Sequence, residues 1–596
     1  MQAKIFYTHN IEKLTLDLKI LLKKKSTLAL LRFTAVISIV ICWYFLNPLG
    51  LVYLLIPVFL LLILFTRLVF ADLKNKSAIE QNNNLVKINE DELKALAHQY
   101  FQFAEGNEFI PKEHFYANDL DIFGHASLYQ YINRTSSEMG SNTLAGWLLD
   151  PADSDTILQR QSAVKELSKQ NEWRQKLQAL GAAKKIQTAT QIRLQKWFAE
   201  ENRFINNKFW ILLRFLLPAI MLTAIALNIT DLLSNIVRNY FLLAAALIAF
   251  YISKKVSPLH QQVSKMTEEL EVLRESIALI ELTAFNSPYL KHLQKQFSEQ
   301  NEMASVKLKK LKGILERLDM RYNIVVFIPL DILLQWDLQQ VLALEKWKEQ
   351  NHKNVIEWFT ALGLFEAVNS FATLSFNHPE WCFPILKLEH FFIEGKNIGH
   401  PLIQTEKCVN NPLKIDHAGE LMLVTGSNMA GKSTYLRSIG VNTILAMAGA
   451  PVCASYFCLS PVQIISSMRI ADNLEESTST FYAELKKLKT VIDKVNDKEK
   501  VFILLDEILR GTNSLDRHTG SVALIKQLIK HNAAGIIATH DVELAKLKAV
   551  YPANILNYHF DVQVNNDELY FDYKLKEGIC TSLNASILMK KVGIEL

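Results

Sequence analysis

The chain is poor in the residue types that mark several protein classes. Its 596 residues include only six cysteines, 20 glycines and 15 prolines. The scattered cysteines argue against a disulfide-stapled secreted scaffold. The low glycine and proline content, with charged residues at 21%, excludes collagen-like and largely disordered chains. A net charge of only +5 gives no overall electrostatic signature of a nucleic-acid binder.

Two of the cysteines, Cys453 and Cys458, form a C-x4-C pair. No second pair and no nearby histidine accompanies them in the sequence. Because structural zinc sites need four such ligands, we expect buried thiols here rather than a metal site.

Long apolar runs, by contrast, are plentiful. Leu28–Leu46 and Leu51–Phe70 each approach the ~20 residues that a helix needs to cross a bilayer. The turn between them, Asn47–Gly50, is too short to form a domain. Residues 28–70 therefore predict a transmembrane helical hairpin.

A second pair of apolar runs, Phe209–Leu227 and Phe241–Ile252, predicts another transmembrane hairpin over residues 209–253. Its second run is short. The alternative for this pair is a helical hairpin buried in a protein core.

Basic residues flank both predicted hairpins on one side only. They lie before or after the apolar pairs, and the turns are poor in them: Lys19, Lys23, Lys24, Lys25, Lys74, Lys76, Lys208, Lys254 and Lys255. The positive-inside rule places both termini, and the residues between the hairpins, in the cytoplasm. We therefore expect an integral, multi-pass protein of a bacterial inner membrane.

The other segments differ in hydrophobic pattern. Residues 1–27 predict a cytoplasmic N-terminal segment, and residues 71–208 and 254–384 show the three- and four-residue apolar spacing of helices. This spacing predicts, among others, helices over Val263–Ala284, Leu290–Leu318 and Leu338–Phe359. Residues 385–596 alternate short β-type runs with helical stretches, which predicts a parallel α/β domain.

Residues Gly426–Ser433 read G-x-x-x-x-G-K-S, which is a P-loop. The motif follows the apolar strand Leu421–Val424 and opens a predicted helix, which is the context it requires. Backbone N–H groups of such a loop turn toward phosphate oxygens. We expect Lys432 to reach the β- and γ-phosphates of ATP and Ser433 to ligate Mg²⁺. The predicted nucleotide-binding positions of the loop are Gly426, Ser427, Asn428, Met429, Ala430, Gly431, Lys432, Ser433 and Thr434.

A second apolar strand, Val501–Leu505, ends in Asp506-Glu507, the Walker B arrangement. We predict that Asp506 holds Mg²⁺ and that Glu507 orients or deprotonates the attacking water. We expect these two side chains on opposite faces of the strand. A third strand, Gly535–Ala538, leads to His540, which we predict to sense the γ-phosphate at the ligand edge of the sheet.

These motifs and their flanks resemble the MutS family of mismatch-repair ATPases. The resemblance covers about residues 390–594 and rests on His400-Pro401, Thr425–Arg437, the signature segment Asp472–Leu474 with Ser479, Thr480, Phe481 and Glu484, Asp506–Asp516, Lys576–Gly578, Asn584-Ala585 and Gly593-Ile594. A weaker resemblance to the family's helical core lies in Gly140–Pro151, Arg160–Val164 and Asp331–Ala343.

The resemblance implies an α/β P-loop ATPase domain of the ABC/MutS type, preceded by an all-α core, that binds and hydrolyses ATP with Mg²⁺. It also implies a homodimer in which the signature segment of one subunit completes the site of the other. Ser479 and Thr480 would then contact nucleotide across the interface, and ATP would switch the geometry of the dimer. The partner that the family implies is DNA, mismatched or otherwise structured.

The chain departs from the family pattern in several places. Ser427 and Ala430 replace the usual proline and glycine of the loop, and Cys408 stands where the family commonly has an aromatic residue that stacks on adenine. The N-terminal domain that reads mismatches is missing. Phe103–Glu105 has the letters of that domain's wedge but lacks its neighbouring glycine. Residues 254–330 are short for the family's DNA clamp.

Two lysine clusters are candidate phosphate contacts, with a solvated helix face as the alternative: Lys307, Lys309, Lys310 and Lys312, and Lys184 with Lys185. Three function classes follow. The first is a membrane-anchored MutS-like ATPase acting on DNA, and the second is an ATP-driven membrane switch acting on an unknown protein or lipid partner. The third, an ABC-type transporter, is weakest because no Leu-Ser-Gly-Gly-Gln segment occurs.

Overall fold

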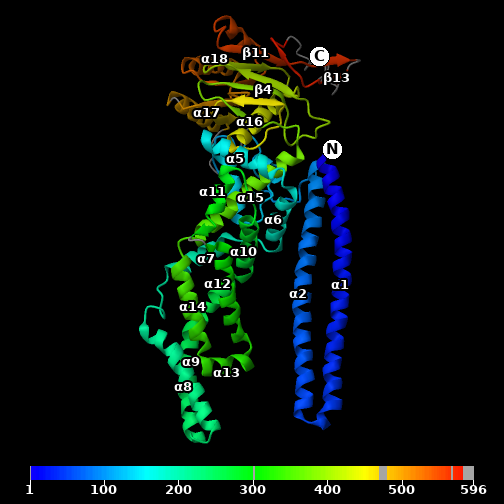
Figure 1. The fold of residues 1–596 in the computed structure, drawn as a ribbon. Coiled ribbons are helices and arrows are strands. Elements are labelled where there is room, and N and C mark those ends of the chain that lie inside the picture. Colours follow the sequence, from blue (N-terminus) through cyan, green and yellow to red (C-terminus); the bar gives the residue numbers. More distant parts are fainter. Residues whose placement is uncertain are drawn as a thin grey trace.

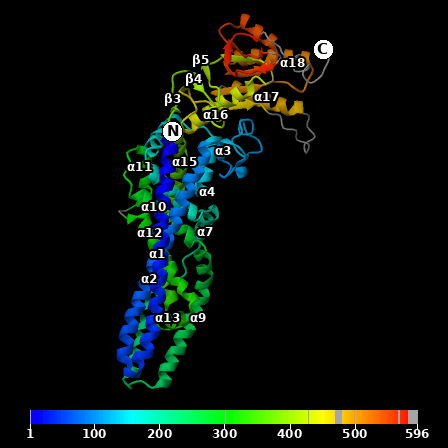
Figure 2. The same cartoon turned by 90° about the vertical axis from the view of Figure 1, so that its right-hand side faces the viewer.

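The computed structural model shows a helical stem carrying an α/β region at one end (Figure 1). It describes residues 2–299, 302–427, 429–468, 480–497, 499–565 and 568–580. The long N-terminal helices and the later helical hairpin extend in the same direction from the α/β region (Figure 2), and the view of Figure 1 shows that the two hairpins stand apart from one another.

The N-terminal hairpin is longer than its apolar runs. Helix α1 spans Gln2–Leu46 and helix α2 spans Leu51–Leu96, so that residues 2–27 and 71–96 continue the same helices. Between them the short helix η1 (Asn47–Leu49) and Gly50 reverse the chain. Gly50 has a φ of 109°, a conformation that residues with a Cβ rarely adopt.

A second hairpin is formed by α8 (Lys208–Ile229) and α9 (Asn235–Ser264). The turns of both hairpins point to the same end of the molecule, away from the α/β region (Figure 1). In length and composition, five single helices among the described residues suit a membrane span: α1, α2, α8, α9 and α15 (Val355–Asn377). The most apolar stretch is 78% buried inside the protein in α15 but only 6–17% buried in the other four. Helix α15 is therefore a core helix, whereas the two hairpins expose their apolar side chains.

Helix α15 crosses α4 (Glu138–Leu149) closely. A Cβ on Gly363 would lie 3.0 Å from backbone atoms of Met139. The buried Glu366 carboxylate accepts hydrogen bonds of 2.6–3.3 Å from the N–H and hydroxyl groups of Ser136 and Ser137, just before α4. Around this crossing pack α3 (Leu128–Ile132), α5 (Ser154–Leu167), α6 (Asn171–Ala183), α7 (Thr188–Ala199) and α10 (Thr267–Glu281). The short helix η2 (Asn107–Phe109) lies next to α3, where the ring of Phe109 contacts that of Tyr129.

All three of the predicted helices are wrong in their extent. The predicted helix Val263–Ala284 runs across a break, because α9 ends at Ser264 and α10 begins at Thr267. The predicted helix Leu290–Leu318 is broken into α11 (Pro288–Lys295), the short strands β1 (Ser298–Glu299) and β2 (Glu302–Met303), and α12 (Ala304–Leu318). The predicted helix Leu338–Phe359 is divided between α14 (Trp336–Asn351) and α15. Apolar spacing persists across the breaks because the helices on either side both bury apolar side chains, such as Leu293 in α11 and Leu308 in α12. Between α12 and α14 lie η3 (Asp319–Tyr322) and α13 (Ile324–Leu334).

The α/β region contains a six-stranded sheet in the order β14-β11-β6-β10-β9-β8. Its strands are β6 (Leu421–Thr425), β8 (Gln463–Ser467), β9 (Val501–Asp506), β10 (Ala534–Thr539), β11 (Ile555–Phe560) and β14 (Leu575–Glu577). All neighbours are parallel except β11 and β14. The helices of this region are α16 (Lys432–Ala448), α17 (Thr480–Asn496), α18 (Ser514–Lys530) and η4 (Val542–Ala549).

A second sheet corrects the prediction of a purely parallel domain. It has the order β3-β7-β4-β5 and is mainly antiparallel. Its strands are β3 (Ile385–Leu386), β4 (Ile393–Ile398), β5 (Asn411–Ile415) and β7 (Tyr456–Leu459), and a separate pair joins β12 (Gln563–Asn565) to β13 (Glu568–Tyr570).

Candidate functional site: a nucleotide cleft at the sheet edge

Strand register brings the three sequence motifs to one edge of the main sheet. Thr539 at the end of β10 pairs with Thr425 at the end of β6, and Ala538 pairs with Asp506 at the end of β9. The strands are parallel, so the segments that follow them emerge side by side. The P-loop, Glu507 and His540 therefore share the carboxyl edge, where ligands bind in open α/β sheets.

The P-loop turns on two glycines. Gly426 has a φ of 149°, and a Cβ there would lie 2.8 Å from the carbonyl oxygen of Phe560. Gly431 has a φ of 103° and precedes the first residue of α16. The loop therefore needs glycine at both motif positions, and α16 directs its N-terminus at the cleft.

Lys432 is buried at the start of α16. Its Nζ donates hydrogen bonds to the carbonyl oxygens of Gly426 (3.0 Å) and Ser427 (2.9 Å). His540 Nε2 lies 3.4 Å from the same atom. Burial lowers the pKa of Lys432, and the carboxylates of Glu507 and Asp506 oppose that shift.

Ser433 and Asp506 meet across the cleft. The Ser433 hydroxyl donates to Asp506 Oδ2 at 2.5 Å. Asp506 is buried, and its other oxygen, Oδ1, has no hydrogen-bond partner within the described part of the chain. A hydroxyl and a carboxylate with free acceptor capacity form a donor set suited to a hard cation such as Mg²⁺.

Glu507 lies one residue beyond β9 and has a φ of 51°. Its carboxylate pairs with the ring of His540 and lies 3.2 Å from Nε of Arg510. Arg510 also lies 3.7 Å from Asp506 Oδ2, so both carboxylates face the same cleft. The prediction of opposite faces is therefore wrong, because the left-handed backbone of Glu507 ends the alternation of the strand. The hydrogen bond with His540 is the main cause that lowers the pKa of Glu507.

Sequence reasoning assigned no separate role to Glu484 on α17. This side chain is 3% exposed. It accepts hydrogen bonds from the backbone N–H of Leu509 (2.5 Å) and of Arg510 (3.1 Å). Glu484 thus holds the turn that carries Glu507, a role that its distance along the chain concealed.

A cavity of about 470 Å³ opens beside the P-loop. Met429, Lys432 and Ser433 line it, as does Cys408, the position where the resemblance expects an aromatic residue. An aromatic ring reaches this cavity from another element, because Tyr573 also lines it and lies 3.1 Å from a Cβ built on Gly431. The ring belongs to a sequence-distant segment that no motif singled out.

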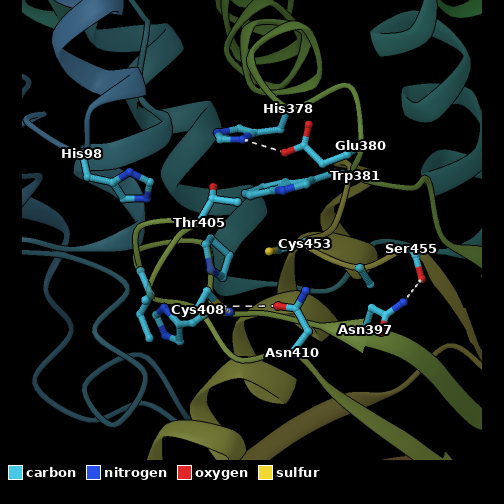
Figure 3. A pocket seen from close by; sticks show the side chains of 14 residues that line it. His98, His378, Glu380, Trp381, Asn397, Thr405, Cys408, Asn410, Cys453 and Ser455 are labelled. Atoms are coloured by element: carbon cyan, nitrogen blue, oxygen red, sulfur yellow. Dashed lines mark hydrogen bonds and ion pairs between the residues drawn. The ribbon is translucent and has the colours of Figure 1, made fainter. Parts of the chain in front are cut away.

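A second cavity of about 250 Å³ adjoins the first, and His400, Ile403 and Cys408 line both (Figure 3). Its opposite wall includes His98, just after α2, and Trp381, whose ring stacks on His378 at 4.2 Å. The loop that carries His400, Ile403 and Cys408 therefore lies between the nucleotide cleft and the end of the N-terminal hairpin.

The prediction of two buried thiols is confirmed for Cys458, whereas Cys453 is partly exposed. Burial still raises the pKa of the Cys453 thiol to about 12. No group of three or more His, Cys, Asp or Glu side chains in the described ranges is arranged to hold a metal ion.

Several predicted residues lie outside the described part of the chain: Asn428, Asp472–Leu474, Ser479, Asn584-Ala585 and Gly593-Ile594. Thr480 is the first residue of α17. Of the other P-loop positions, Ala430 is buried and Met429 is exposed toward the cleft cavity, which Thr434 also lines.

The lysine clusters are largely engaged within the protein. Lys307 is buried, Lys310 pairs with Glu302, and Lys312 lies 3.0 Å from Glu271. Lys184 lies 3.0 Å from Glu268. The side chains of Lys184 and Lys310 nevertheless stay 49% and 61% exposed, and exposed ion pairs contribute little, so these contacts do not decide between a solvated helix face and a phosphate-binding surface.

Comparison with known proteins shows which family the α/β region is similar to. A family model described as MutS domain V matches residues 422–590. MutS protein homolog 4 of Mus musculus is 35% identical over 195 residues, which are 31% of this chain and 20% of that protein. DNA mismatch repair protein MSH4 of Arabidopsis thaliana is 31% identical over 197 residues, covering 33% and 24% of the two chains.

DNA mismatch repair protein MutS of Thermotoga petrophila is 31% identical over 206 residues, 34% of this chain and 26% of that protein. The matches thus span about a fifth to a quarter of these relatives' length. They support MutS family membership through the nucleotide domain, and the predicted α/β P-loop class of that domain agrees with them.

Proposed function

We propose that the chain is a membrane-anchored, Mg²⁺-dependent ATPase of the MutS type that works as a homodimeric switch. One observation carries the proposal. The side chains that phosphate binding, metal binding and water activation require meet in one cleft: Lys432, Ser433, Asp506, Glu507 and His540.

The residues present fit ATP with Mg²⁺. Ser433 and the free oxygen of Asp506 would hold the cation, which when bound neutralises charge on the phosphates. Lys432 would exchange its two loop carbonyls for phosphate oxygens, because an ammonium group binds an anion more strongly than a neutral carbonyl.

Hydrolysis is assigned to Glu507. A carboxylate with a lowered pKa is ionised at neutral pH and is able to accept a hydrogen bond or a proton from water. His540 holds that carboxylate in place from the neighbouring strand, and Arg510 steadies it from the other side. We therefore assign Glu507 to the water and His540 to positioning and γ-phosphate sensing.

Membrane anchoring is assigned to α1 with α2 and to α8 with α9. Their apolar side chains face outward, which in water would leave a large unfavourable apolar surface. The turns of both hairpins share one end, and the flanking lysines lie toward the α/β region. This arrangement supports insertion from the cytoplasmic side of a bacterial inner membrane.

Two kinds of partner remain as candidates. The names of the relatives point to DNA mismatch repair, which favours a DNA partner. The two hairpins with outward apolar side chains favour the second candidate, a switch that acts on a protein or lipid partner without DNA. In both cases the proposed dimer would transmit ATP binding through α15 and the stem.

The ATPase rate of the detergent-purified full chain separates these candidates. We would measure it alone and with duplex, mismatched, single-stranded and branched DNA, with Glu507→Gln as the blank. Stimulation by one DNA form would identify DNA as the ligand. A robust rate that is indifferent to every DNA form would favour the protein or lipid partner. No hydrolysis above the blank, with and without DNA, would contradict the ATPase assignment itself.

A further inference from the structure

Helix α13 exposes an apolar surface that neither hairpin explains. It is a short helix without a charged residue except Asp331, which is buried. Its outward side chains include Val325, 84% exposed. The other large apolar side chains exposed on α13 are Ile324, Val326 and Ile328.

Two hydrogen bonds fix the level of α13 against α9. At one end, Arg321 donates to the carbonyl oxygen of Ser253 at 3.1 Å, and at the other, Gln335 donates to that of Ala245 at 3.4 Å. Eight residues of helix separate these carbonyls, a rise of about 12 Å. Helix α13 therefore lies beside the apolar part of α9, next to Lys254 and Lys255.

Helix α13 does not join α14 to form a broken span. The axes of the two helices differ by 80°, and the break lies at Gln335, which has a φ of 52°. Helix α14 buries Leu338, Val341 and Leu344 in the protein core. Helix α13 alone is thus left outside, crossing the base of α12 and α14 (Figure 1).

The polar side of α13 is tied to the protein. Asp331 accepts a hydrogen bond of 2.9 Å from the backbone N–H of Asp337, and Asp337 lies 3.5 Å from Arg321. These contacts hold the buried side inward, so the exposed apolar side chains face away from the stem. The resulting surface is continuous with α8 and α9, which α13 contacts.

We propose that α13 is a membrane-embedded helix whose exposed side lies among the acyl chains of the cytoplasmic leaflet, with its Arg321 end near the headgroups and its Gln335 end about 12 Å deeper along α9. Lys254 and Lys255 stand at the level of the lipid headgroups, where such side chains favour the interface. The bilayer would then contact α12 and α14 directly as well as through the hairpins. The inference rests on the proposed insertion of α8 and α9.

The test uses the unmodified full chain in nanodiscs of phosphatidylethanolamine and phosphatidylglycerol. A small fraction of the lipid carries a photoactivatable diazirine in its acyl chain, and adducts are mapped by mass spectrometry. We expect adducts on α13 at a yield comparable with that on Leu243 of α9, and none on Leu515 of α18, which is exposed outside the stem.

The outcomes separate the two proposals. Adducts on α9 without adducts on α13 would overturn the membrane contact of α13 and leave the insertion of the hairpin in place. Absence of adducts from both α9 and α13 would overturn membrane insertion together with this inference. In the double variant Val325→Asp/Ile328→Asp, labelling of the rest of α13 should fall by about tenfold or more, because charge is expelled from acyl chains. The matched Leu515→Asp variant should leave the labelling of α13 unchanged. Labelling of α13 that persists in the double variant would contradict the inference.

Discussion

Glu484 should control the rate of hydrolysis without touching the nucleotide. It is the acceptor for two backbone N–H groups in the turn that follows Asp506. That turn holds two non-glycine residues at positive φ, Glu507 at 51° and Leu509 at 60°. Such conformations cost about 1–3 kcal/mol each and persist only where the surroundings hold them. Without Glu484 the turn should relax and misplace Glu507.

The magnitude follows from the two hydrogen bonds. A hydrogen bond to a charged group contributes about 1.5–3 kcal/mol, so the pair is worth about 3–6 kcal/mol before desolvation. Burial raises the pKa of Glu484, which shows that desolvation offsets part of this sum. Because the raised pKa means that desolvation outweighs these hydrogen bonds in their effect on ionisation, the loss in Glu484→Ala is better taken from the two N–H groups that lose their acceptor, at about 1–3 kcal/mol each, and we use about 3 kcal/mol for the pair. At about 1.4 kcal/mol per factor of ten, kcat should fall by about 100-fold.

The assay is steady-state ATP hydrolysis with nucleotide affinity measured separately. Affinity should stay within a few-fold in Glu484→Ala, because Lys432 and Ser433 keep their contacts. The control Glu484→Gln keeps one carbonyl oxygen and should lose only about tenfold in kcat, since one of the two bonds survives. A wild-type kcat in Glu484→Ala would refute the reasoning, whereas equal loss of affinity and rate would indicate an unfolded domain.

Four further predictions concern the cleft. Lys432→Ala should abolish nucleotide binding, and an unchanged ATP affinity in equilibrium titration would remove the P-loop assignment. Glu507→Gln should bind ATP, hydrolyse it about 100-fold more slowly or worse, and accumulate as a dimer in size-exclusion chromatography with ATP; normal turnover would show that another group activates water. His540→Ala removes the hydrogen bond that lowers the pKa of Glu507, so this pKa should rise and the acidic limb of the kcat–pH profile should move to higher pH; an unmoved limb would assign it to another group. Tyr573→Ala should weaken ATP binding by about 1 kcal/mol, or roughly fivefold, if the ring stacks on the base, and Tyr573→Phe should not; equal losses in both would mean that the hydroxyl, not the ring, matters.

The cleft could be predicted where its residues are close in the sequence to strand ends. Glycines, Lys432 and Ser433 follow β6 directly, and Asp506 ends β9, so motif spacing and strand order were sufficient. Glu484 and Tyr573 could not be placed in this way. Their roles depend on α17 and on the segment before β14 folding back over the cleft, and sequence spacing does not record such contacts.

The helices of the stem, too, could be predicted only in part from the sequence. Apolar length predicted both hairpins, and the described helices contain those runs. Periodicity missed the break between α11 and α12 because it reports which side is buried and not where the backbone turns. The weaker family resemblance gave Asp331–Ala343 as one stretch of the helical core, whereas Gln335 divides that stretch between α13 and α14.

The length of α2 determines how far the nucleotide domain would stand from the membrane under the proposed insertion. Its 46 residues measure about 69 Å. Under the proposed membrane insertion, a bilayer core of about 30 Å around residues 51–70 would leave residues 71–96 to rise about 40 Å beyond it. The surface potential of anionic lipids decays over a Debye length of about 8 Å at physiological salt. In a chain inserted as proposed, that potential would have all but vanished at the top of α2, so a polyanion approaching the nucleotide domain would meet no repulsion from the membrane. A partner confined to the lipid surface, in turn, would have to be tall enough to bridge that gap or act on the stem.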